Sequence, residues 1–143
     1  MPIHYAKDGH VVTITIDRPE ARNSLDLEHF GQLADCWVRY RDDDDAFVAI
    51  LTGVGDVYCV GADLKKFITI VTEQADKLRD GGSKNKVEGE NYTMAHSLIA
   101  VLRDGATLPD GSEFTLYKPV IAAINGICAA GGMEMMWNTD LRV

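Results

Sequence analysis

Hydrophobic and polar residues alternate along residues 10–17, where Val12, Ile14 and Ile16 share one face. This period of two predicts a half-buried β-strand. Further on, Asp26 is placed to cap a helix, because its side chain can accept a hydrogen bond from an early backbone N–H. The apolar residues that follow recur at helical spacing: Leu27, Phe30, Leu33, Trp37 and Val38. The acidic run 42–45 ends this predicted helix and is typical of a solvated loop rather than a cation site.

Two short continuous apolar runs, residues 47–52 and 120–124, predict buried strands. Each leads into a glycine-marked turn and then into a helix-like run, the second from Gly131 to Trp137. Residues 140–143 begin one more strand. Because strands alternate with helices, the pattern favours an α/β fold, and residues 1–143 are predicted to form part of a single domain.

The chain between the two turns is harder to assign. Residues 68–87 mix helix-forming residues with glycines and charges, so we expect a mobile, partly helical cover. Residues 91–102 carry apolar positions at helical spacing, and residues 104–115 are predicted to form a long loop.

Composition and charge exclude several classes of function. The 143 residues are 46% hydrophobic with a formal net charge of −8, which disfavours binding to nucleic acid. No apolar run reaches the roughly 18 residues of a membrane span, and the N-terminus lacks the pattern of a secretory signal, so we expect a cytoplasmic protein. The cysteines, Cys36, Cys59 and Cys128, and the four histidines show no metal-ligand spacing, so no metal is expected.

The two glycine-marked turns are the strongest chemical signal. Residues 61–65 read GADLK, and residues 126–134 read GICAAGGME. A backbone N–H at a helix start is a fixed donor, and two donors that converge on one oxygen form an oxyanion hole, which stabilises an enolate. The alternative interpretation is structural, with strand-to-helix connections, an Asp63 helix cap and glycines required by packing.

Together with the KPVIAAING run before the second turn, residues 118–126, these turns resemble the enoyl-CoA hydratase/isomerase (crotonase) family. The resemblance covers the whole chain but only about the first half of the family pattern. It implies a crotonase-like spiral of ββα units, truncated before the C-terminal helical region. It also implies a homo-oligomer, a trimer or hexamer, completed by the missing half.

The resemblance further implies the roles of individual residues. Ala62 and Gly131 would donate the two N–H groups, and Glu134 would activate water. The acyl-CoA substrate would contact residues from three segments: Arg22, Asn23, Ser24, Val60, Ala62, Asp63, Leu64, Lys65 and Gly131. Coenzyme A belongs to the substrate, so no separate cofactor is implied.

The leading hypothesis is therefore an enoyl-CoA hydratase, a lyase that adds water across the 2,3 double bond of an enoyl thioester. The second catalytic glutamate would follow Val143, so we expect the 143-residue chain alone to be inactive. We also expect the apolar neighbours of Glu134 to bury it and raise its pKa. Alternatives are another acyl-CoA activity (isomerase, dehydratase or thioester hydrolase), or a non-catalytic acyl-CoA-binding or subunit-pairing fragment. For Glu134, the structural alternative is a surface glutamate.

Overall fold

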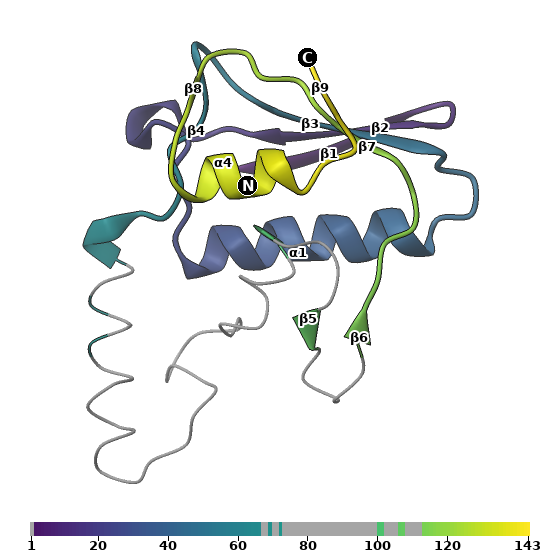
Figure 1. The fold of residues 1–143 in the computed structure, drawn as a ribbon, viewed down its shortest axis with the longest axis horizontal. Coiled ribbons are helices and arrows are strands. Elements are labelled where there is room, and N and C mark those ends of the chain that lie inside the picture. The colour runs from purple at the N-terminus through teal and green to yellow at the C-terminus, as the bar shows by residue number, and fades with distance from the viewer. Residues whose placement is uncertain (1, 67–68, 70–71, 73–99, 102–105, 108–112) are drawn as a thin grey trace, which may run out of the picture.

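The computed structural model describes residues 2–66, 69, 72, 100–101, 106–107 and 113–143. Its main sheet has the strand order β1-β2-β3-β7-β9 (Figure 1). β1 and β2 form an antiparallel hairpin, whereas the pairs β2/β3, β3/β7 and β7/β9 are parallel. The five strands are Ile3–Asp8, Val11–Ile16, Val48–Gly53, Val120–Ala122 and Leu141–Arg142. The α/β class predicted from the alternating pattern is confirmed.

One long helix, α1 (Leu27–Asp42), packs along this sheet (Figure 1). The predicted cap is confirmed, because the Asp26 side chain accepts a hydrogen bond of 3.1 Å from the His29 backbone N–H. The apolar face of α1 and the sheet form one buried core. The Tyr40 hydroxyl donates to Pro119 O at 2.8 Å, which ties the C-terminal part of the helix to the chain entering β7.

A second, small sheet carries the chain into both glycine-marked turns. β4 (Val57–Cys59) and β8 (Ile127–Cys128) run parallel to each other, side by side in Figure 1. The pattern had not predicted β8, because a strand of two residues is too short to show a period. Helix α4 (Gly131–Trp137) begins and ends where the sequence predicts.

The loop predicted over residues 104–115 was wrong in part. It contains two short antiparallel strands, β5 (Ala106–Thr107) and β6 (Glu113–Phe114). The Phe114 ring is fully buried, and the Arg41 guanidinium lies 4.9 Å from its centroid, so tertiary packing orders this segment. The partly helical cover predicted at 68–87 and most of the helix predicted at 91–102 lie outside the described residues.

Candidate functional site

The two glycine-marked turns lie against each other. Gly61 has φ +89°, and a Cβ on it would lie 2.6 Å from the Gly131 nitrogen, so no other residue fits there without a shift. A Cβ on Gly131 would in turn lie 3.3 Å from Gly61 Cα and 3.8 Å from the Ala62 nitrogen. The fold therefore brings the first turn to the N-terminus of α4. Their nearness is what the oxyanion-hole hypothesis requires.

The direction of the Ala62 N–H is set by a parallel bridge to Leu25. Leu25 N–H donates to Gly61 O at 2.8 Å, and Asp63 N–H donates to Leu25 O at 2.8 Å. Because backbone groups alternate along an extended chain, the N–H of the intervening Ala62 points away from Leu25. Within the described part of the chain it donates to no backbone carbonyl.

The second turn presents the Gly131 N–H in a different way. Gly132 N–H donates to Ala129 O at 2.9 Å, and Ala130 has φ 47° and ψ −127°, which together define a type II′ turn. Gly131 is the first residue of α4, so its N–H has no partner within the helix and lies at the positive end of the helix dipole. The turn thus leaves the Gly131 N–H at the start of α4 without a partner inside the helix, and it requires a positive φ at Ala130.

Glu134 lies one helical turn beyond Gly131, as the hypothesis requires, but the expected burial was wrong. Its side chain is exposed in the described structure. Gly132 and Met135 form the face of α4 that packs inward, while Trp137 is 63% exposed. Hydrophobic neighbours in sequence do not bury Glu134 because they lie on other sides of the helix.

Two thiols lie near the turns but do not offer a nucleophile. Burial raises the pKa of Cys59 to about 12, and burial also raises the pKa of Cys128. Both groups are therefore neutral near pH 7. The described residues contain no group of three or more His, Cys, Asp or Glu placed to hold a metal ion. Among them, no helix has the length and apolar character needed to span a bilayer.

The loop of Arg22, Asn23 and Ser24, expected along coenzyme A, runs beside the first turn. Asn23 is fully buried, and its side-chain amide donates to Val54 O at 3.1 Å and to Val57 O at 2.6 Å. Arg22 and Asn23 both have positive φ, and Arg22 is exposed. The Asn23 side chain therefore organises the loop, and contact of this loop with a ligand stays a prediction.

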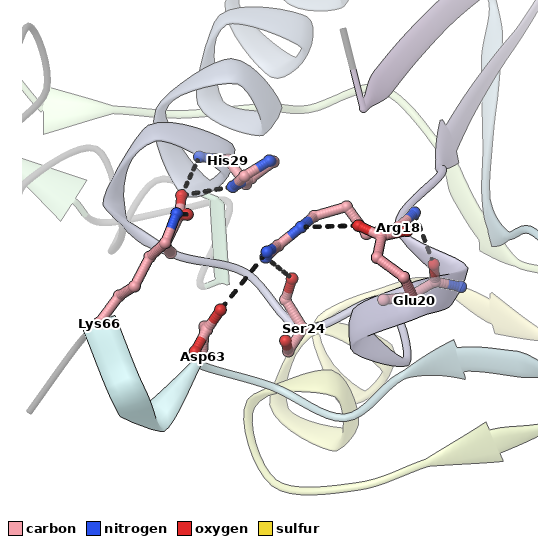
Figure 2. A network of polar contacts seen from close by, with 8 residues as sticks. Arg18, Glu20, Ser24, His29, Asp63 and Lys66 are labelled. Atoms are coloured by element: carbon pink, nitrogen blue, oxygen red, sulfur yellow. Dashed lines mark hydrogen bonds and ion pairs between the residues drawn. The ribbon is translucent and has the colours of Figure 1, made fainter.

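Sequence reasoning missed two ion pairs near the first turn, which are made by the basic residues Arg18 and Lys66. The Arg18 guanidinium donates to Ser24 O at 2.6 Å and pairs with Asp63 at 3.4 Å (Figure 2). Lys66 pairs with Asp26 at 2.7 Å. Asp63, expected to cap a helix, thus contacts Arg18 instead. No local spacing signals these pairs, because their members are far apart in the sequence.

Asp26 is the most strongly perturbed carboxylate near the turns. Burial acts to raise its pKa, but hydrogen bonds from Lys66 and from the backbone N–H and ring of His29 outweigh this, so its pKa falls to about 2. Asp26 therefore carries its charge at every physiological pH and serves as an anchor, not as a proton donor.

The remaining predicted contact residues lie in and beside the first turn, and their exposure to solvent increases along the chain. Val60, Ala62 and Asp63 are half-buried, whereas Leu64 is 66% exposed and Lys65 is exposed. A 66% exposed leucine beside an exposed lysine offers an apolar and a cationic contact next to the Ala62 donor. Their contact with acyl-CoA stays a prediction.

Known proteins of one family are similar to this chain in sequence and in fold. The model of the enoyl-CoA hydratase/isomerase family matches residues 6–143. An (E)-benzylidenesuccinyl-CoA hydratase of Thauera aromatica is 38% identical, over 100% of this chain and 46% of that protein. An enoyl-CoA hydratase of Mycobacterium tuberculosis is 34% identical, over 94% of this chain and 43% of that protein. The crystal structure of an enoyl-CoA hydratase from Bacillus anthracis matches with a TM-score of 0.70 and 28% identity, over 99% of this chain and 46% of that one.

The chain has a crotonase-like α/β fold, which it shares with this crystal structure. The chain belongs to the enoyl-CoA hydratase/isomerase family. It spans about half the length of the relatives it matches.

Proposed function

We propose that the protein is an enoyl-CoA hydratase, which adds water across the 2,3 double bond of an enoyl-CoA thioester. The observation that carries this proposal is the contact between the two turns, where a Cβ on Gly131 would lie 3.8 Å from the Ala62 nitrogen. Because Gly61 and Gly131 lie in contact, the N–H groups of Ala62 and Gly131 are near enough in the fold for us to propose that both bind one thioester oxygen. Binding is strongest when that oxygen carries the negative charge of the enolate, which is how such a site accelerates the reaction.

In the proposed mechanism Glu134 activates the water that attacks C3. Its place one turn beyond Gly131 lets the carboxylate reach towards the same thioester that the N–H groups hold. A second carboxylate, supplied by chain outside residues 1–143, would deliver the proton to C2. Binding of the coenzyme A portion by the loop at Arg22 and by Lys65 is part of the same proposal, as is assembly into trimers or hexamers.

A second candidate is an isomerase of the same family. Isomerisation uses the same enolate and the same two N–H donors, so the turns favour both reactions equally. Glu134 favours hydration, because it supplies a carboxylate for activating water on the α4 side of the thioester.

The test is Glu134→Gln in the full-length protein. This change keeps size and hydrogen bonding but removes proton transfer, so kcat for hydration of a short 2-enoyl-CoA should fall by roughly 10² to 10⁴. Loss of the ultraviolet absorbance of the conjugated thioester measures the rate, and calorimetry measures binding, which should change little. The control is Glu113→Gln, an exposed glutamate on β6.

Unchanged hydration by Glu134→Gln would show that Glu134 does not activate the water and would make the glutamate structural. A wild-type protein that isomerises but does not hydrate enoyl-CoA would put isomerisation ahead of hydration. A wild-type protein that neither hydrates nor isomerises any enoyl-CoA would contradict both catalytic candidates. It would leave acyl-CoA binding without catalysis.

A further inference from the structure

Leu25 and Ala62 are joined by a parallel bridge, and in each of the two bridged segments the next residue is a carboxylate paired with a basic side chain. Figure 2 shows these basic side chains, Arg18 and Lys66. Ser24, directly before Leu25, and Asp63, directly after Ala62, are both held by Arg18. Asp26, directly after Leu25, is held by Lys66. The segment that directs the Ala62 N–H is thus fixed at both ends by side chains from elsewhere in the chain.

The two pairs differ in their exposure to water. Arg18 and Asp63 side chains are only 12% and 18% exposed, so solvent screens their attraction weakly. Lys66 is 60% exposed, so its pair with Asp26 is screened more strongly. Arg18 also contacts both bridged segments, Ser24 O at 2.6 Å in one and Asp63 at 3.4 Å in the other, whereas the Lys66 ammonium contacts Asp26 in one of them.

Arg18 is itself held in place at its backbone. Its N–H donates to the buried Asn23 Oδ1 at 2.9 Å, and its carbonyl accepts from the Asn23 N–H at 2.8 Å. The planar guanidinium then reaches Ser24 O and Asp63 Oδ2 with its two terminal nitrogens. A lysine ammonium lacks this fork and cannot match both contacts in the same geometry.

We propose that Arg18 is a positioning residue for catalysis. By joining Ser24 O to the Asp63 carboxylate, it fixes the bridge between Leu25 and Ala62, and this bridge directs the Ala62 N–H at the substrate oxygen. The inference rests on the proposed function, because it gives that N–H a catalytic task. It adds a residue that touches neither substrate nor reacting atoms. Its effect should appear in the transition state more than in binding, since misplaced donors lose most where charge develops.

The experiment uses the full-length protein with Arg18→Met, Arg18→Lys and Asp63→Asn, and the double variant R18M/D63N. The matched control is Arg41→Met, which removes an arginine–aspartate pair with Asp42 at the far end of α1. For each, kcat and KM for a 2-enoyl-CoA are measured together with thermal unfolding. Hydrogen exchange of the Leu25 and Asp63 amides reports the bridge directly.

Arg18→Met should lower kcat roughly tenfold or more, with KM changed by less than about threefold, since loss of a whole oxyanion donor costs roughly 10² to 10³. Asp63→Asn should lower kcat less than Arg18→Met, because the contact of Arg18 with Ser24 O remains. The double variant should be no worse than Arg18→Met, because the Arg18–Asp63 contact is already lost in that single variant. The kcat of Arg18→Lys should lie between those of wild type and Arg18→Met. The two amides should exchange faster in Arg18→Met and stay unchanged in Arg41→Met.

The proposal is overturned if folded Arg18→Met keeps wild-type kcat, or if its kcat falls no more than that of Arg41→Met. It is also overturned if the kcat losses of Arg18→Met and Asp63→Asn multiply in the double variant. If Arg18→Met does not fold, Arg18→Lys and Asp63→Asn give the same decision. A wild-type protein without turnover would sink the proposed function alone. Amide exchange would then still decide whether Arg18 holds the bridge, and unchanged exchange would refute that too.

Discussion

Asp26 shows how one residue can serve local and long-range structure at once. It caps α1 through the His29 N–H and pairs with Lys66, which follows the first turn. The cap is a local feature, so the sequence predicts it from an Asp that precedes an apolar helical pattern. The ion pair is not predictable in this way, because it joins residues that only the tertiary fold brings together.

The lowered pKa of Asp26 predicts a dependence of stability on pH. Its pKa falls from an ordinary 3.8 to about 2 on folding, so the stabilisation is complete above about pH 4 and is lost as the pH falls towards 2. Asp26→Asn keeps a capping side chain but loses the charge. We expect it to cost roughly 1–2 kcal/mol at pH 7, and the cost to shrink below pH 4.

Urea unfolding of wild type and Asp26→Asn across this pH range measures the difference in free energy of unfolding. Asp44→Asn, in the exposed loop after α1, is the control and should cost little at any pH. A cost for Asp26→Asn that stays constant from about pH 7 to 2.5 would show that the charge on Asp26 does not stabilise the fold.

Among the elements of the fold, the glycine-marked turns were predicted from the sequence, whereas the exposure of Glu134 and the short strands β5 and β8 were not. The pattern from Gly131 to Trp137 predicts the bounds of α4 correctly, because the glycine-marked turn indicates where the helix begins. The exposure of Glu134 was not predicted, because composition around a residue does not say which side of a helix meets the core. Strands β5 and β8 are too short to show a period in the sequence.

The type II′ turn before α4 carries a testable strain. Ala130 has φ 47° and ψ −127°, a conformation that favours glycine. Ala130→Gly should therefore raise the free energy of unfolding by about 1 kcal/mol, since relief of strain exceeds the added backbone entropy of the unfolded chain.

Chemical denaturation measures this change, and Ala129→Gly is the control, because Ala129 has no positive φ. The free energy of unfolding of this control should fall by about 0.5–1 kcal/mol. If both variants lose stability equally, the turn carries no strain at Ala130.

At the scale of the whole molecule, the sheet and the turns form a framework for half of a family-sized chain. β9 lies at an edge of the main sheet, and Trp137, Leu141 and Val143 are each at least 60% exposed nearby. That a further segment or a second subunit covers these residues stays a prediction. The α/β class followed from the sequence, whereas the sheet order did not, because parallel pairing joins strands distant in sequence.

The proposed oxyanion hole requires the Ala62 and Gly131 N–H groups to polarise a thioester carbonyl. This is measured by the isotope-edited infrared stretch of a 2-enoyl-CoA labelled with ¹³C at the thioester carbonyl. The ligand is bound to full-length Glu134→Gln, which should consume it roughly 10² to 10⁴ times more slowly than wild type. Two donors should move the stretch to lower frequency than in water. Adding Gly131→Ala should reverse much of that shift, because its methyl would lie 3.3 Å from Gly61 Cα, tighter than ordinary contact, and would displace one turn from the other. A carbonyl stretch equal to that of the free thioester in water, with the ligand bound, would contradict the account.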